Sequence, residues 1–397
     1  MRKHLFILAA IVLFTITAIF IYHRTYTFEG SIDTVLNKHY LKYKDQEYFS
    51  GIAVSIYRPN EEIKNFYAGA TSHDTSAKRI SDETLFQIGS ITKSFTAAII
   101  LQLEKEGKLK ISDTLKQWLP QYPHWSSLNI QSLLDMTSGL PNYSDAPYMN
   151  ATVFHQPDKV FSTKELIAFV YPAGELSAPL RPGYHYTNTG YILSEMIIED
   201  ITQQSFQHEI EHRLFKAADL NNTFYPVPAL DKKAANRVAN GYGFNPYDNP
   251  ELLGKDIHNI SLSWAGAAGA VISNTSDIIK WVKALFVDDK ILDPQQKQEM
   301  MQMVSTISGQ PLTSVSSNDP EGFALGVTQR YRKEIGTFWF YEGETLGYRA
   351  LYMYVPANGI IISAIFNSAV NHDNDHAGEL MQNIYNIAKQ NSATPST

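Results

Sequence analysis

A serine and a lysine three residues apart, Ser90 and Lys93, open an apolar stretch with helical periodicity. Residues at this spacing lie on the same face of a helix, about one turn from each other. The amine is then within reach of the hydroxyl, which is what a nucleophilic serine needs when no histidine acts as its base. About one Ser-x-x-Lys is expected by chance in a chain of this length. The pair therefore predicts a nucleophile only together with further elements downstream.

The second element with catalytic chemistry is Tyr186 and Asn188, which lie between a Pro-Gly pair and an apolar helical run. A phenol can relay a proton between nucleophile, lysine and leaving group, and a carboxamide can hold a substrate amide. The same Tyr-x-Asn spacing recurs at 148–150 and 247–249, within loop segments rich in Asn, Pro and Asp. We interpret those two tripeptides as structural and take the pair at 186 and 188 as the candidate.

The third element is the run Tyr341, Glu342, Gly343 and Glu344, placed at the end of one predicted strand and before the next. A glycine there lets the backbone approach a ligand closely. The backbone N–H of Glu344 could then pair with that of Ser90 as an oxyanion hole. One such donor contributes about 2.7–4 kcal/mol to the transition state.

Strands and helices that could position these groups are read from hydrophobic periodicity and turn signals. Alternating or continuous apolar runs predict strands at both ends of the chain, and helical spacing predicts a helix after Ser90 and another near the C-terminus. The predicted strands are 51–57, 63–70, 323–331, 337–341, 350–355 and 360–366, and the predicted helices are 90–106 and 379–389.

This order predicts an α+β fold, in which hairpins from both ends of the chain form one antiparallel sheet flanked by helices. We expect one domain over 28–390, divided into an α/β lobe from about 30–111 and 261–390 and a mostly helical lobe over about 112–260. Ser90 would lie at the seam between the lobes, where ligand sites are common.

The two chain ends are predicted to lie outside this domain. Residues 1–27 contain Arg2 and Lys3 followed by an uncharged stretch from Leu5 to Tyr22. That stretch just spans a bilayer core, and no Ala-x-Ala cleavage pattern ends it, which favours a retained signal anchor over a cleaved signal peptide. The expected location is the cell membrane with an extracytoplasmic (periplasmic) domain, or secretion if the signal is cleaved. The polar tail 391–397 is expected to be disordered.

Composition excludes several classes of function. The net charge of −7 argues against a nucleic-acid partner, which would need a basic surface. There are no cysteines, so disulfides, thiolate metal sites and a cysteine nucleophile are absent. The 12 histidines show no metal-ligand spacing, and we expect neither a metal nor a cofactor.

The three elements, in this order, resemble the penicillin-recognising serine hydrolases. Within these, the chain is similar to the branch of class C β-lactamases, D-alanyl-D-alanine carboxypeptidases and related esterases. Further landmarks lie at 133–141, 266–277 and 356–367, so the resemblance covers roughly 49–368. It implies a β-lactamase/transpeptidase-like fold and an exported serine hydrolase that acts on an ester, amide or peptide through an acyl-enzyme.

The resemblance also implies roles for individual residues. Ser90 would attack a carbonyl, and Lys93 and Tyr186 would take and redeliver the proton, with their division of labour left open. The backbone N–H groups of Ser90 and Glu344 would hold the oxyanion, and Asn188 would orient the acyl amide. The implied partner is a small molecule or a peptide substrate.

One departure from the family pattern concerns substrate binding by Tyr341, Glu342 and Gly343. The triplet usually begins with Lys or His, whose charge helps to bind a substrate carboxylate, whereas here it begins with Tyr341 and an acidic residue follows. Unless a cation such as Arg349 compensates, neutral esters or amides become the favoured substrates. Two other interpretations stay open. In the first, Glu342 points away from the cleft, because alternate strand residues face opposite sides. In the second, the protein is a low-turnover penicillin-binding-like sensor.

Overall fold

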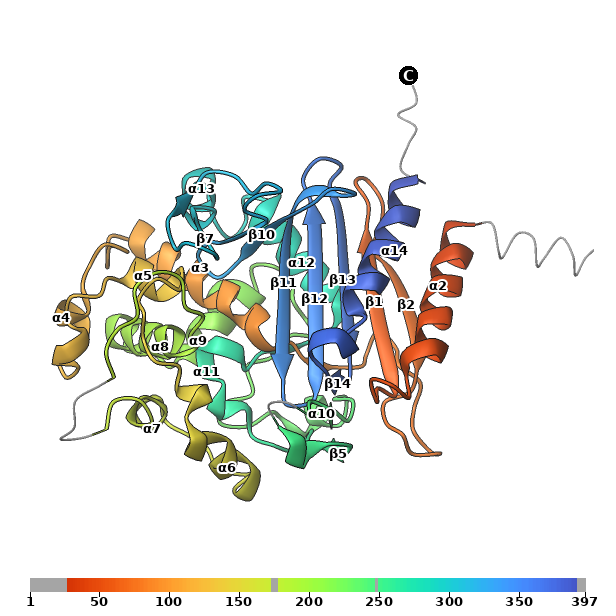
Figure 1. The fold of residues 1–397 in the computed structure, drawn as a ribbon, viewed down its shortest axis with the longest axis horizontal. Coiled ribbons are helices and arrows are strands. Elements are labelled where there is room, and N and C mark those ends of the chain that lie inside the picture. Colours follow the sequence, from red (N-terminus) through yellow and green to blue (C-terminus); the bar gives the residue numbers. More distant parts are fainter. Residues whose placement is uncertain (1–26, 173–177, 247–248, 391–397) are drawn as a thin grey trace, which may run out of the picture.

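A computed structural model describes residues 27–172, 178–246 and 249–390 and shows an α+β fold (Figure 1). The predicted fold class is thus confirmed. Its centre is a nine-stranded antiparallel sheet that combines strands from the two ends of the described chain. In spatial order the strands are β2 (Lys64–Gly69), β1 (Gly51–Tyr57), β13 (Ile360–Phe366), β12 (Tyr348–Val355), β11 (Gly336–Thr345), β10 (Thr328–Arg332), β9 (Glu321–Phe323), β7 (Met303–Ser305) and β8 (Pro311–Leu312).

Short strands and helices complete the structure. Two small sheets are formed by β14 (Ser368–Ala369), β4 (Tyr242–Gly243) and β5 (Lys255–Asp256), and by β3 (Phe86–Gln87) and β6 (Ile272–Ser273). The helices are α2 (Phe28–Tyr43), α3 (Thr92–Lys105), α4 (Leu115–Trp118), α5 (Ile130–Leu134), α6 (Pro147–His155), α7 (Thr163–Ala168), α8 (Thr189–Thr202), α9 (Phe206–Ile210), α10 (Lys232–Ala235), α11 (Gly266–Gly269), α12 (Thr275–Phe286), α13 (Pro294–Met300) and α14 (Ala377–Gln390).

The large sheet separates two hydrophobic cores. Its inner face packs against α3 and α12 in the larger core, and its outer face packs against α2 and α14 in the smaller one. Figure 1 shows α2 and α14 beside β1, β2 and β13, with α4 to α8 gathered at the opposite side of the molecule. Strand β11 contributes to both cores, since Trp339 and Tyr341 face inward while Phe338 and Phe340 face outward. This alternation decides which residues of β11 can reach Ser90.

Several predicted elements have the bounds that the sequence indicates, and others differ. The strands at 51–57 and 360–366 are confirmed to the residue. The single strand predicted over 323–331 is wrong, because a turn at Gly326 divides it into β9 and β10. Gly326 has φ +73°, and a Cβ there would lie 2.6 Å from the carbonyl oxygen of Lys93. The chain turns at this point because only glycine can pack so closely against the start of α3.

Helix α2 is not predicted by the residue pattern alone. Its sequence is polar on average, yet Ile32 and Leu36 are fully buried at helical spacing against the outer face of the sheet. The Thr27 hydroxyl caps the helix by accepting a hydrogen bond from the N–H of Gly30. The predicted signal segment over 1–27 and the predicted tail 391–397 lie outside the described residues, apart from Thr27, and the division into two lobes stays a prediction.

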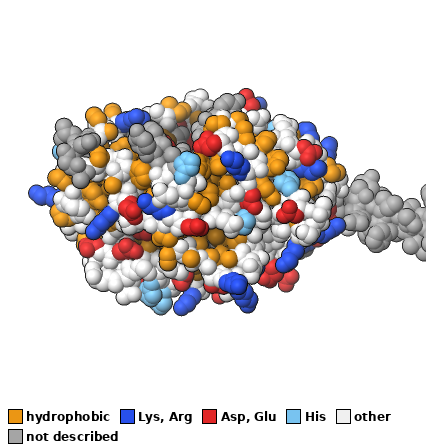
Figure 2. Space-filling view, turned by 90° about the horizontal axis from the view of Figure 1, so that it is seen from below, with side chains coloured by type: hydrophobic (Ala, Val, Ile, Leu, Met, Phe, Trp, Pro, Cys, Tyr) orange, Lys and Arg blue, Asp and Glu red, His pale blue; other side chains and the backbone are white. Residues whose placement is uncertain are grey.

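Basic and acidic side chains are interspersed on the face of the molecule shown in Figure 2. Such mixing gives no strong positive field on that face, which polyanion binding would need. The expectation that nucleic acid is not a partner stays a prediction.

Candidate active site

Ser90 lies in a 3₁₀ turn, Gly89–Ile91, that leads directly into α3. Ile88 and Ile91 on either side are fully buried, whereas Ser90 is partly exposed. Gly89 has φ +51°, and a Cβ on it would lie 2.6–2.8 Å from backbone atoms of Glu344. The glycine therefore allows the turn to pack directly on β11, and this contact fixes the serine beside Glu344 of that strand.

Lys93 is fully buried one turn further along, as the spacing predicts. Its Nζ donates hydrogen bonds to the Ser90 Oγ at 2.9 Å and to the carbonyl oxygen of Ala268 in α11 at 2.8 Å. None of the ion pairs among residues 27–172, 178–246 and 249–390 includes Lys93. Burial is the main cause that lowers its pKa, because the ammonium form loses its hydration. A buried amine with a lowered pKa is suited to accept a proton.

Tyr186 completes the contacts of the nucleophile. Its hydroxyl donates a hydrogen bond to the Ser90 Oγ at 2.7 Å, and its ring lies 5.0 Å from the Lys93 Nζ. The side chain is 41% exposed, so its hydroxyl group joins the buried lysine to the open side of the site. The structure thus brings together the three residues for which the sequence predicts a catalytic role.

Asn188 occupies the position before the first residue of α8, two residues beyond Tyr186, and its side chain makes no capping hydrogen bond to the helix. Its side-chain Nδ2 donates to the hydroxyl of Ser144 at 2.9 Å, and its backbone N–H donates to the Asn142 Oδ1 at 2.9 Å. The amide is therefore held by the loop at 142–144, in a fixed orientation. The sequence gives no signal for Asn142 or Ser144, since they approach Asn188 only through the fold.

The sequence predicts that Gly343 follows the strand. In the structure it lies inside β11, because β11 continues to Thr345. A Cβ on Gly343 would overlap the carbonyl oxygen of Ile88 and lie 2.8 Å from the backbone nitrogen of Ser90. A glycine within a strand often marks such a close approach of another backbone. The backbones of Ser90 and Glu344, the two predicted oxyanion donors, are thus adjacent in space.

The other two residues of the triplet point to opposite faces of the sheet. Tyr341 is buried on the inner face, where its ring lies 6.1 Å from that of Phe323. Burial and the neighbouring Tyr186 raise the pKa of its hydroxyl, which keeps the group neutral. Glu342 is on the outer face, beneath α14, so its predicted contact with substrate is wrong in this geometry. The alternation of side chains along a strand explains the difference.

Arg349 does not supply the missing cation. It is fully buried on the outer face, and its guanidinium binds Glu47 at 2.7 Å and Asp375 at 2.5 Å. Its Nε donates to the carbonyl oxygen of Ser368 at 3.0 Å. All of these partners lie across the sheet from the nucleophile, so the idea that Arg349 compensates for Tyr341 is not supported.

Glu195 on α8 supports the site, although the sequence gives no reason to single it out. Its carboxyl accepts a hydrogen bond from the N–H of Ala267 at 2.9 Å, and the next residue, Ala268, holds Lys93. Burial raises the pKa of Glu195 to about 8. At neutral pH the carboxyl is therefore protonated, and Glu195 carries no negative charge that would stabilise the ammonium form of Lys93.

Replacing Glu195 by glutamine should change how stability depends on pH. The folded protein retains the Glu195 proton up to about pH 8, whereas the unfolded chain releases it near the ordinary value of 4.5. The group's stabilising contribution is therefore complete below about pH 4.5 and is lost as pH rises to about 8. In the natural protein this group should make the free energy of unfolding lower at pH 9 than at pH 5. In Glu195→Gln the decrease between these pH values should be smaller by roughly 2–4 kcal/mol.

Urea unfolding at pH 5, 7 and 9 measures this difference. Asp200→Asn, on an exposed position of the same helix, is the matched control and should leave the pH profile as it is. Parallel profiles for the natural protein and Glu195→Gln would show that the carboxyl does not carry this proton.

The residues that the structure describes contain no cluster of three or more His, Cys, Asp or Glu side chains able to hold a metal ion. Within the same residues, no helix combines the length and the apolar character that a membrane span needs. The predicted anchor at 5–22 lies outside them.

Comparison with known proteins identifies the family of the chain. Residues 36–385 match the sequence model of the Beta-lactamase family, which is most of the chain. The chain belongs to the Beta-lactamase family. It is 30% identical over 223 residues to Penicillin-binding protein 4* of Bacillus subtilis (strain 168), which is 55% of this chain and 48% of that protein. It is 26% identical over 282 residues to the Putative penicillin-binding protein PbpX of the same strain, 68% of this chain and 64% of that protein. The chain thus spans about half to two thirds of the length of these curated relatives.

Solved structures show the same fold. The D-amino acid amidase from Ochrobactrum anthropi SV3, complexed with L-phenylalanine amide, superposes with a TM-score of 0.75 at 23% identity and covers 92% of this chain and 99% of its own. The D-alanine carboxypeptidase AmpC from Burkholderia cenocepacia has a TM-score of 0.66 at 18% identity and covers 91% and 99%. The predicted β-lactamase/transpeptidase-like fold and the resemblance to penicillin-recognising serine hydrolases are confirmed. This Beta-lactamase family member therefore has the fold of a serine hydrolase.

Proposed function

We propose that the protein is a serine hydrolase that forms an acyl-enzyme on Ser90. The observation that carries the proposal is the convergence of the Lys93 amine and the Tyr186 hydroxyl on one serine oxygen, at 2.9 and 2.7 Å. A buried lysine without an acidic partner has no evident structural benefit, because burying its amine is costly. Its lowered pKa suits a base.

In the proposed reaction, the Ser90 Oγ bonds to the substrate carbonyl carbon while its proton passes to the Lys93 Nζ. The backbone N–H groups of Ser90 and Glu344 stabilise the negative charge on the carbonyl oxygen. The proton accepted by Lys93 passes to the leaving alkoxide or amine through the hydroxyl of Tyr186, which lies on the open side of the site, so that Lys93 and Tyr186 are both restored as the bond to carbon breaks. Water then attacks the acyl-serine, which releases the acid and restores the serine hydroxyl.

An active-site probe tests the nucleophile directly. After exposure to a fluorophosphonate, the intact-mass spectrum should show a single adduct that maps to Ser90 and is absent from Ser90→Ala. Ser126→Ala is the control, since Ser126 lies outside the Ser90 turn and α3 and its replacement should not affect labelling. A folded natural protein that forms no adduct would favour the low-turnover sensor instead.

The substrates that we propose are neutral esters or amides, including peptides without a carboxylate next to the scissile bond. Tyr341 replaces the expected cation, and Arg349 is bound to acidic groups on the other face of the sheet. The named activity of the structurally similar D-amino acid amidase is compatible with an amide substrate that carries no carboxylate.

Introducing a cation at the triplet should change this preference. We compare kcat/KM for an ester substrate that carries a free carboxylate with kcat/KM for the same substrate with that carboxylate methylated. Tyr341→Lys should raise this ratio by about tenfold or more, because a hydrogen bond to a charged group contributes about 1.5–3 kcal/mol. Glu342→Gln, on the opposite face, should leave the ratio as in the natural protein. If Tyr341→Lys leaves it equally unchanged, this position does not govern recognition of the carboxylate.

Export of the hydrolase domain is also part of the proposal. It is supported by the positive residues that precede the apolar stretch at 5–22. Cell fractionation of the full chain beside a chain that starts at Phe28 checks it, since only the full chain should reach the membrane or the exterior.

A further inference from the structure

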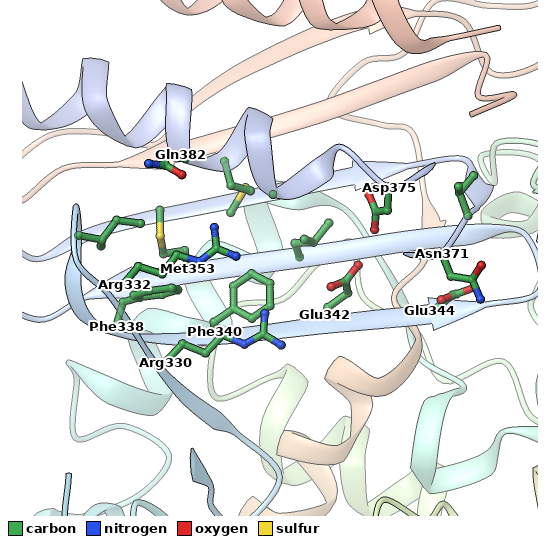
Figure 3. Close-up of a pocket in the computed structure, with 15 residues that line it drawn as sticks. Arg330, Arg332, Phe338, Phe340, Glu342, Glu344, Met353, Asn371, Asp375 and Gln382 are labelled. Carbon is green, nitrogen blue, oxygen red and sulfur yellow. The ribbon is translucent and has the colours of Figure 1, made fainter. Parts of the chain in front are cut away.

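A cavity lies on the outer face of the sheet, between β10, β11, β12 and α14 (Figure 3). Its volume is about 370 Å³, within the range of small-molecule sites. We call it the α14 pocket. Its floor is apolar, and the side chains that form it come from the sheet and from α14: Ile335, Phe338, Phe340, Leu351, Met353 and Met381. It is separated from Ser90 by the thickness of β11.

One end of the α14 pocket is acidic. Figure 3 shows the carboxyl groups of Glu342 and Asp375 facing each other from β11 and from the loop before α14. Asp375 is paired with Arg349, which also binds Glu47, so two carboxyl groups share this guanidinium. Burial, and then the neighbouring Asp375, raise the pKa of Glu342 to about 7. A bound ammonium group would stabilise the ionised form of Glu342.

The other end of the α14 pocket is basic. Arg330 stacks over the ring of Phe340 at 4.2 Å and pairs with Glu321 at 2.6 Å. Arg332, beyond it, is exposed, and its guanidinium makes no ion pair or hydrogen bond with any residue of the described ranges. The pocket therefore has one cation available for a ligand at the end remote from Glu342.

The spacing of the two ends limits the size of the ligand. Phe338, at the basic end, and Glu342 are four residues apart on β11, or about 13 Å at 3.3 Å per residue. A tripeptide, at most about 11 Å long when extended, fits within this span and carries an ammonium at one end, a carboxylate at the other and side chains between. The apolar floor would accept aliphatic or aromatic side chains.

We propose that the α14 pocket is a second binding site, which holds a short zwitterionic peptide with apolar side chains. Its amino end lies against Glu342 and Asp375, its carboxyl end against Arg332, and its side chains on the floor of the pocket. Such a site lies directly behind the segment of β11 that abuts the Ser90 turn. It does not depend on whether Ser90 is a nucleophile.

Isothermal titration calorimetry of the full chain with trileucine tests the proposal. We expect binding at one site, weakened about tenfold or more by N-acetylation of the peptide and by amidation of its carboxylate, since each removes one charged contact. Arg332→Gln and Glu342→Gln should weaken binding to a similar degree. Arg332 is exposed, so its replacement leaves the fold intact even if the change at Glu342 does not.

Two control variants distinguish binding in the α14 pocket from binding at the Ser90 site. Lys333→Gln removes an exposed charge next to Arg332 that does not line the pocket, and Asn188→Ala alters the Ser90 side. Both should bind trileucine as the natural protein does. The proposal is overturned if trileucine does not bind at millimolar concentration, if Arg332→Gln has no effect, or if Asn188→Ala alone abolishes binding.

Discussion

Replacing Lys93 by methionine is expected to lower kcat/KM for an activated ester by roughly 10²–10⁴-fold, the usual contribution of a general base. The methionine side chain fills a similar volume, so the effect isolates the amine. In the natural protein, the Nζ lies 2.9 Å from the Ser90 Oγ and has no acidic partner in the described chain. Its lowered pKa makes the neutral form available, and activity should rise with pH as the ammonium loses its proton.

Steady-state kinetics from pH 5 to 10 measure both effects. Lys105→Met is the matched control, because Lys105 is on the same helix but is exposed and pairs with Asp293. It should keep the natural activity and pH profile. A Lys93→Met protein that retains most of its kcat/KM would move the role of base to Tyr186.

The catalytic residues could be predicted from sequence because each motif is local. The positions of Ser90 and Lys93 follow from helical spacing, and Tyr186 is marked by the Pro-Gly before it and the helix after it. These signals depend on neighbours in the chain, which the sequence shows directly. Their meeting in space required the family resemblance, since Tyr186 lies 96 residues from Ser90.

Other features could not be predicted because they depend on the phase of a strand or on distant contacts. The orientation of Glu342 stays open in the sequence, because the residues of β11 at 338–343 are largely buried on both faces and so show no alternation of polarity. The supporting role of Glu195 depends on α11, 72 residues away. Buried polar residues of this kind look like ordinary surface positions in a sequence.

Replacing Arg349 by methionine is expected to lower the free energy of unfolding by about 3–5 kcal/mol, because it leaves buried acidic groups without their cation. Arg349 and Glu47 are both fully buried and 2.7 Å apart, and Asp375 binds the same guanidinium. Glu47 follows α2 and Asp375 precedes α14, so the cluster joins both helices of the outer layer to β12. Its loss should loosen the packing of these helices on the sheet.

Urea unfolding at pH 7 measures the change. In Arg349→Met/Glu47→Gln one of the buried negative charges left without Arg349 is also removed, so the double variant should be more stable than Arg349→Met, although Asp375 still lacks its partner. Lys108→Met, which breaks an exposed pair with Glu106, is the control and should cost no more than about 1 kcal/mol. A loss from Arg349→Met as small as that of this control would mean that water reaches the cluster and that its charges are solvated. The outer layer would then be held by apolar contacts of α2 and α14 alone.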